Sequence, residues 1–173
     1  FAVEYPAPGD PDLAAEIAEV VKPRWVGLDH DSWGIDHGTW SVLIHAYPEA
    51  DIPVVQLSID ATKPPEYHVA LGAALAPLRQ QGVLIVGSGN VVHNLRILDR
   101  GAGETETASA GWAQDFDDAA KAAMDAGDLN ALAAWEFLSA GASTAVPFPD
   151  HYFPMLYAAG AAQTGEKPRH VFE

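Results

Sequence analysis

The segment that most constrains the fold is residues 82–96, GVLIVGSGNVVHNLR. Its four consecutive apolar residues, 83–86, are bounded by glycine and predict a strand buried on both faces. Gly87 and Gly89 carry no Cβ, so the backbone there can turn sharply or approach a ligand closely. Polar side chains just past the carboxyl end of a buried strand often lie at the ligand site of an open α/β sheet. His93 is therefore the first candidate for chemistry, and the alternative is that it caps a helix or bonds within the core.

A second apolar stretch, residues 52–59, predicts another buried strand. Between the two strands, the spacing of Leu71, Leu75 and Leu78 predicts a helix that Gly82 ends. Strand, helix and strand in about 35 residues is the size of a βαβ unit, for which a right-handed crossover and parallel pairing are expected. We therefore expect an α/β fold, a single domain with a central, largely parallel or mixed sheet flanked by helices.

Further helices are expected wherever apolar residues recur at helical spacing. These segments are residues 12–21, 40–47, 114–125, a helix that begins at the Asp128 cap, and 150–160. Residues 29–38 are polar and contain two glycines, so they predict a loop.

Composition excludes several classes of function. The chain has 9 basic and 24 acidic residues and a formal charge of −15, which disfavours nucleic acid or an anionic membrane as a partner. It has no cysteine, so any metal must be held by His, Asp or Glu. No apolar run approaches the roughly 18 residues that span a bilayer, and no signal peptide opens the chain, so we expect a cytoplasmic protein.

Three histidines lie where sites commonly form: His37, His93 and His151. His37 follows Asp36, whose carboxylate could orient the imidazole, in a loop rich in glycine and aspartate. His151 lies among prolines that stiffen the backbone, and a stiff loop suits a metal ligand. Each histidine taken alone is more often structural than functional. Weaker candidates are the remaining histidines, His30, His45, His68 and His170, of which His45 and His68 are interpreted as ordinary helix residues.

Five blocks of the sequence stand in the order found in one enzyme family. They are YPAPG at residues 5–9, WGIDHGTW at 33–40, IPVVQLSID at 52–60, GSGNVVHNL at 87–95 and PFPDHYFP at 147–154. In these blocks the chain resembles the class III extradiol ring-opening dioxygenases, and within them the DOPA dioxygenase branch. The blocks are spread over residues 5–154, which is most of the chain.

The resemblance implies a single α/β domain with a non-haem metal, Fe(II) or Zn(II). The family inserts both atoms of O₂ into a catechol and cleaves a ring bond beside the two hydroxyls. A divalent metal with open positions binds the catechol oxygens and lowers their pKa. A neutral imidazole nearby can take up a catechol proton and later return it. The implied partners are therefore a small aromatic diol and O₂.

Matched block by block, His151 is the expected metal ligand of the PFPDH block. His93 matches the histidine of the SGNVVH block and is assigned as acid/base catalyst and as a second metal ligand. His37 matches the DHG histidine and is assigned as a catalytic residue that faces substrate or oxygen. The residues assigned to substrate binding are Asp36, Asn90 and Asn94.

The chain also departs from the family pattern. Two upstream blocks with metal-binding histidines, His-Gly-Ser-Pro and Ala-His-Trp, are absent from the sequence, which begins on Phe1. Asp150 stands where the family often has glutamate. We therefore expect residues 1–173 to be the C-terminal part of a single dioxygenase-like domain, with a missing N-terminal segment or a partner chain completing the metal site. Such a fragment is expected to bind metal weakly and to be inactive alone.

Three functions stay open from sequence. The first is an extradiol dioxygenase that acts on a DOPA-like catechol. The second is a metal-free or truncated relative that acts as a binding or interaction module. The third and weakest is a metal-dependent hydrolase, because His and Asp in α/β loops also serve that chemistry.

Overall fold

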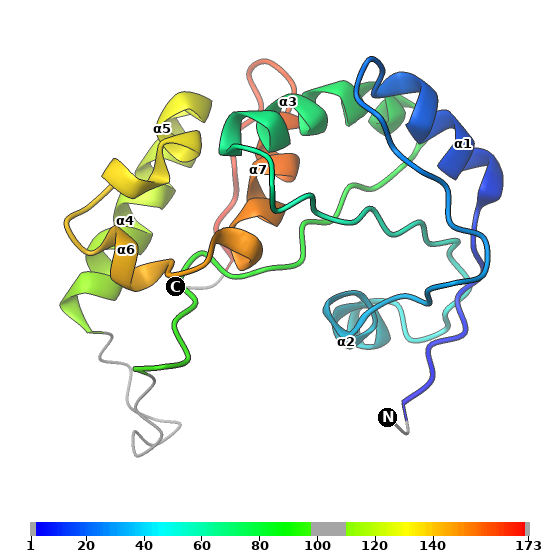
Figure 1. The fold of residues 1–173 in the computed structure, drawn as a ribbon, viewed down its shortest axis with the longest axis horizontal. Helices are drawn as coiled ribbons and strands as arrows, with labels where there is room; N and C mark the ends of the chain where they lie inside the picture. The colour runs from blue at the N-terminus through cyan, green and yellow to red at the C-terminus, as the bar shows by residue number, and fades with distance from the viewer. Residues whose placement is uncertain (1–2, 98–109, 172–173) are drawn as a thin grey trace. The chain divides into compact units, whose positions relative to one another are not determined.

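A computed structural model describes residues 3–97 and 110–171. The chain divides into two compact units, residues 1–59 and residues 60–173. Within each unit, helices are joined by extended segments (Figure 1). The assignment of residues 1–173 to a single domain stays a prediction.

The expected central sheet is wrong for the part of the chain that the structure describes, because no described residue forms a strand. Residues 83–86 have no regular secondary structure, and Leu84 is 66% and Val86 54% exposed, so this segment is not buried on both faces. Ile52, in the other expected strand, is 47% exposed. A strand needs a neighbour that exchanges backbone hydrogen bonds with it, and neither segment has such a ladder. Of the predicted βαβ unit, the structure therefore contains the helix but neither of the two strands.

Unit 1 contains α1 (Pro11–Val20) and α2 (His37–Ala46). The Asp10 carboxylate caps α1 by accepting the Leu13 N–H at 2.9 Å, and Pro11 opens the helix, as the sequence predicts. Helix α2 begins earlier than expected. The Asp36 carboxylate accepts the Thr39 N–H at 3.0 Å, so His37 is the first helical residue and does not belong to a loop.

Unit 2 carries the remaining described helices. They are α3 (Pro65–Leu75), η1 (Ala76–Gln81), α4 (Gly111–Ala126), α5 (Leu129–Ala133), η2 (Trp135–Phe137), α6 (Ala142–Ala145), η3 (Pro149–His151) and α7 (Phe153–Gly160). The helices predicted at 114–125, after Asp128 and at 150–160 are confirmed as α4, as α5 and as η3 with α7. Across the described parts of the chain, no helix has the length and apolarity needed to cross a membrane.

Helices α3 and α7 pack side by side and form the centre of unit 2 (Figure 1). The predicted stripe of Leu71, Leu75 and Leu78 is buried. A Cβ on Gly72 would overlap the Tyr157 carbonyl, and one on Gly160 would overlap the Val69 carbonyl. The two glycines therefore let the two backbones touch. Because α7 follows η3 directly, this packing also holds the segment that ends in His151.

An ion pair between Arg79 and Glu166, here called the charged clip, holds the chain beyond α7. The Arg79 guanidinium donates two hydrogen bonds to the Glu166 carboxylate, at 2.7 and 2.8 Å, and a third to the Ala161 carbonyl at 2.8 Å. The Gln163 N–H donates to the same carboxylate at 2.7 Å. These donors, Arg79 first, lower the pKa of Glu166 to about 2.

We expect the stabilisation from this clip to depend on pH. A carboxyl with a depressed folded-state pKa stabilises above its ordinary pKa, here 4.5, and the effect is lost as pH falls toward about 2. Urea unfolding of wild type and Glu166→Gln should therefore differ at pH 7, converge below pH 4.5 and coincide near pH 2. Glu136→Gln, at an exposed position of η2, is the control. A difference that does not change with pH would contradict a charge-based clip.

Candidate active site

The structure brings together two of the histidines that the sequence singles out. The rings of His93 and His151 are stacked, with centroids 3.6 Å apart and planes inclined by 20°. His151 ends η3, and His93 lies in the irregular segment that follows the Gly-Ser-Gly sequence. Both predicted metal ligands therefore lie at one place in unit 2.

Glycine makes this contact sterically feasible. A Cβ on Gly89 would overlap the His151 carbonyl, and one on Gly87 would overlap the Pro154 carbonyl. The Asn90 N–H donates to the His151 carbonyl at 2.9 Å. Neither glycine has a positive φ. Of the two reasons predicted for glycine here, close approach is the one the structure shows, and the group approached is the protein's own backbone.

The His93 backbone is held on its other side by α6 and the residues around it. The His93 N–H donates to the Ala145 carbonyl at 2.9 Å, and the Asn94 side-chain amide donates to the Thr144 carbonyl at 2.7 Å. The Asn94 side-chain oxygen accepts the Arg96 N–H at 3.1 Å. Both ends of the Asn94 side chain thus bond to the protein and hold the His93 segment. Substrate contact by Asn94, and by the exposed Asn90, stays a prediction.

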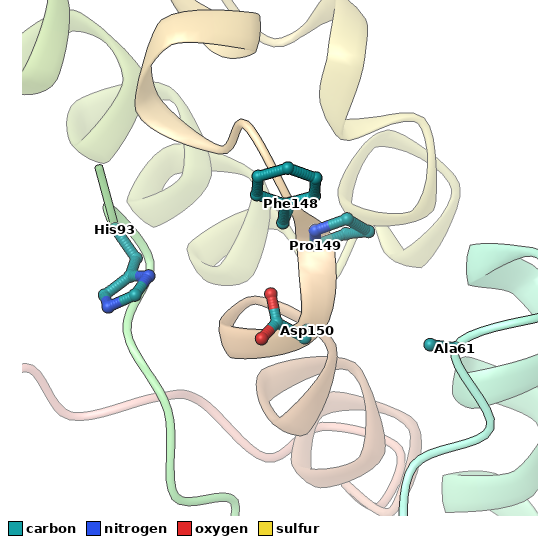
Figure 2. Close-up of a pocket in the computed structure, with 5 residues that line it drawn as sticks. All are labelled: Ala61, His93, Phe148, Pro149 and Asp150. Carbon is teal, nitrogen blue, oxygen red and sulfur yellow. The ribbon is translucent and has the colours of Figure 1, made fainter. Parts of the chain in front are cut away.

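A pocket of about 440 Å³ adjoins the pair, within the size range of small-molecule sites. Figure 2 shows the His93 ring on one side and the Phe148, Pro149 and Asp150 side chains opposite it. Ala61 contributes the remaining wall. The PFPDH block marked this region in the sequence, but Phe148 and Pro149 were not chosen as site residues. Nothing in the chemistry of an alanine could have pointed to Ala61.

The charged groups near the pocket lie in solvent. The Asp150 carboxylate is 3.8 Å from the His151 Nε2, and the two side chains are 58% and 36% exposed. A pair so exposed contributes about 0–1 kcal/mol. The Arg96 guanidinium lies over the Phe148 ring, 5.4 Å from its centroid. The positions of the two imidazoles therefore depend on backbone hydrogen bonds more than on charge.

The two imidazoles fit part of a metal site. Nitrogen ligands of this kind suit iron and zinc, which usually take three protein ligands at catalytic sites. Among residues 3–97 and 110–171, no group of three His, Cys, Asp or Glu side chains is placed to hold a metal ion. Metal binding by His93 or His151 would therefore need further donors, and both assignments stay predictions.

The other two predicted site residues, Asp36 and His37, belong to unit 1. The Asp36 carboxylate caps α2, and its N–H donates to the Gln56 side-chain oxygen at 2.8 Å. The Thr39 hydroxyl donates to the same oxygen, also at 2.8 Å. His37 is exposed at the first position of the helix. The catalytic assignment of His37 and substrate contact by Asp36 stay predictions.

We expect Gly89→Ala to separate the histidine pair. The added methyl overlaps the His151 carbonyl, so the variant must break the Asn90 bond or shift η3, at a cost of about 1–3 kcal/mol. Gly111→Ala is the matched control, because a Cβ at that position meets no atom within 4 Å. Urea unfolding gives the stability, and nuclear Overhauser contacts between the two rings report the stacking. Equal behaviour of the two variants would rule out the close approach.

Known proteins are similar to this chain over nearly its whole length. All 173 residues match the family described as the catalytic LigB subunit of aromatic ring-opening dioxygenase. Over 170 residues the chain is 42% identical to the 4,5-DOPA dioxygenase extradiol of Escherichia coli K12 and 36% identical to that of Beta vulgaris. These alignments cover 97% and 96% of this chain but 61% and 62% of the relatives, so the chain spans about three fifths of their length.

A solved structure is similar as well. The crystal structure of an uncharacterized protein from Escherichia coli K12 is 41% identical and superposes with a TM-score of 0.85. The match covers 97% of this chain and 68% of that one. The resemblance found in the sequence blocks is confirmed: the chain belongs to the LigB family of aromatic ring-opening dioxygenases.

Proposed function

We propose that this chain carries part of the active site of an extradiol dioxygenase that cleaves a catechol-type, DOPA-like aromatic ring with O₂. Membership of the LigB family supports ring-opening oxygenase chemistry. The observation that carries the assignment to these residues is the stacked pair of His93 and His151 beside a pocket of about 440 Å³.

A histidine-held divalent metal, Fe(II) or Zn(II), is part of the proposal. His151 is its first ligand, and further ligands must come from outside the stacked pair. When bound, such a metal lowers the pKa of the catechol hydroxyls and holds O₂ beside the ring.

His93 has two predicted roles, as metal ligand and as acid/base catalyst, and one imidazole cannot fill both at once. A neutral imidazole has one nitrogen with a free lone pair, and its other nitrogen carries the proton. If the free nitrogen bound the metal, it could not accept a proton. Because His93 lines the pocket and His151 does not, we assign proton transfer to His93 and metal binding to His151.

The remaining pocket residues suit an aromatic ring. Phe148 and Pro149 offer apolar faces against which a catechol can pack. The His93 imidazole on the opposite wall can accept a proton from a bound catechol hydroxyl. The backbone bond from His93 to Ala145 keeps that ring in place during proton transfer.

One alternative function, a metal-free binding module, also fits the described residues. The described residues offer no set of three metal-binding side chains, which also suits a metal-free relative that binds a small molecule without turning it over. Such a module would bind a catechol equally well with and without Fe(II), whereas the proposed enzyme binds it more tightly with the metal.

A paired binding and turnover measurement tests the proposal. With the N-terminal segment supplied, we expect Fe(II) to increase the affinity for DOPA and oxygen uptake to accompany a yellow, ring-opened product, which the 173-residue chain alone should not form. His93→Ala should lower turnover by about 10²- to 10⁴-fold, the usual contribution of a general acid–base group, and leave metal binding in place. His151→Ala should abolish the effect of Fe(II) on DOPA binding.

His45→Ala serves as the control, because His45 is an exposed residue of α2. Wild-type rates in both site variants would refute the assignment of the site. Catechol binding that is indifferent to metal would favour the binding module.

A further inference from the structure

His68 differs from its interpretation as an ordinary helix residue, because its side chain on α3 is completely buried. Its ring stacks on Phe153, with centroids 4.2 Å apart and planes inclined by 28°. Tyr67 meets the same ring edge-on, at 5.6 Å and 87°. A polar ring thus occupies an aromatic cluster where an apolar side chain would pack equally well.

The two ring nitrogens of His68 differ in their hydrogen bonding. Its Nδ1 lies 3.0 Å from the Tyr157 hydroxyl oxygen. Burial lowers the pKa of His68 and raises the pKa of Tyr157 to about 12, so a neutral imidazole meets a protonated phenol. The buried Nε2 has no hydrogen-bond partner among the described residues.

The turn formed by residues 60–63 also acts on this imidazole. The Lys63 backbone and the Asp60 carboxylate both oppose the lowering of the His68 pKa. Nδ1 and the Tyr157 hydroxyl share one hydrogen bond, in which the tautomer of the imidazole sets the donor.

Both walls of the pocket lead along the chain into helices α3 and α7, whose side chains meet at His68. Ala61 belongs to the 60–63 turn, which is closed by the Lys63 N–H donating to the Asp60 carbonyl at 3.0 Å. The other wall, Phe148 to Asp150, leads through His151 directly into α7, where Phe153 and Tyr157 contact His68.

We propose that His68 is a positioning residue for the candidate active site, which joins the two walls of the pocket and keeps His151 stacked on His93. Phe153 lies two residues beyond His151, so a shift of Phe153 moves the His151 carbonyl that Asn90 binds. The proposal rests on the proposed site but not on metal binding or ring cleavage.

Nuclear Overhauser contacts between the His93 and His151 rings in the metal-free, 173-residue chain test this role. His68→Phe keeps a ring to stack on Phe153 but removes both nitrogens, and Tyr157→Phe removes a single oxygen atom. We expect both variants to lose the ring-to-ring cross-peak. His68→Asn, whose side-chain amide can reach the position of Nδ1, should restore part of it.

Asp128→Ala is the control for a general loss of stability. It removes the carboxylate that caps α5 by accepting the Ala131 N–H at 2.9 Å, and that cap does not touch the aromatic cluster. We expect this variant to unfold more readily yet keep the cross-peak below its unfolding temperature.

Two results would overturn the inference. One is an unchanged cross-peak in folded Tyr157→Phe, which carries the test even if His68→Phe does not fold. The other is loss of the cross-peak in Asp128→Ala as well. A protein completed by its N-terminal segment that shows the cross-peak but never cleaves a catechol would refute the proposed function and leave the role of His68 standing.

Discussion

The close approach of two backbones is the constraint on which the candidate site depends. Residues 87–90 pass so near to η3 and the start of α7 that no side chain fits at Gly87 or Gly89. The Asn90 N–H can then reach the His151 carbonyl, and the two imidazoles stack. Glycine serves the same purpose between α3 and α7, where Gly72 and Gly160 remove the Cβ atoms that would separate the helices. The close approach at residues 87–90 and the contact between α3 and α7 therefore both hold the segment that contains His151.

Local features of the fold could be predicted from the sequence, and non-local pairing could not. Caps, prolines and leucine spacing placed the helices correctly, because each signal acts within a few residues of itself. The segments around Ile52 and Leu84 have strand-forming residues, but a strand also depends on its neighbour. The prediction of two strands and a sheet from these local signals was therefore wrong for the described residues. The start of α2 was missed because the Asp36 cap lies inside a segment rich in loop-forming residues.

The candidate site, like the fold, could be predicted from the sequence only in part. Sequence blocks pointed to His93 and His151, and the structure places their rings in contact. An asparagine that holds a backbone segment and one that binds a substrate look alike in a sequence motif. The sequence therefore did not reveal the two hydrogen bonds of the Asn94 side chain to the backbone. It also gave no reason to select His68, whose importance comes from burial against Phe153 and Tyr157 on a distant helix. Burial is a property of the assembled unit, and a single position in a helical pattern does not encode it.

The histidine pair is positioned mainly by hydrogen bonds between uncharged groups. Backbone bonds hold the carbonyl of His151 and the N–H of His93, and the Asn94 amide supports the second of these. The nearest carboxylate, that of Asp150, is exposed and 3.8 Å from the His151 Nε2, so salt readily screens its effect. By contrast, the Arg79–Glu166 clip beyond α7 depends on charge. Higher ionic strength can therefore weaken the clip while the hydrogen bonds that hold the two imidazoles in place, which join uncharged groups, are little affected.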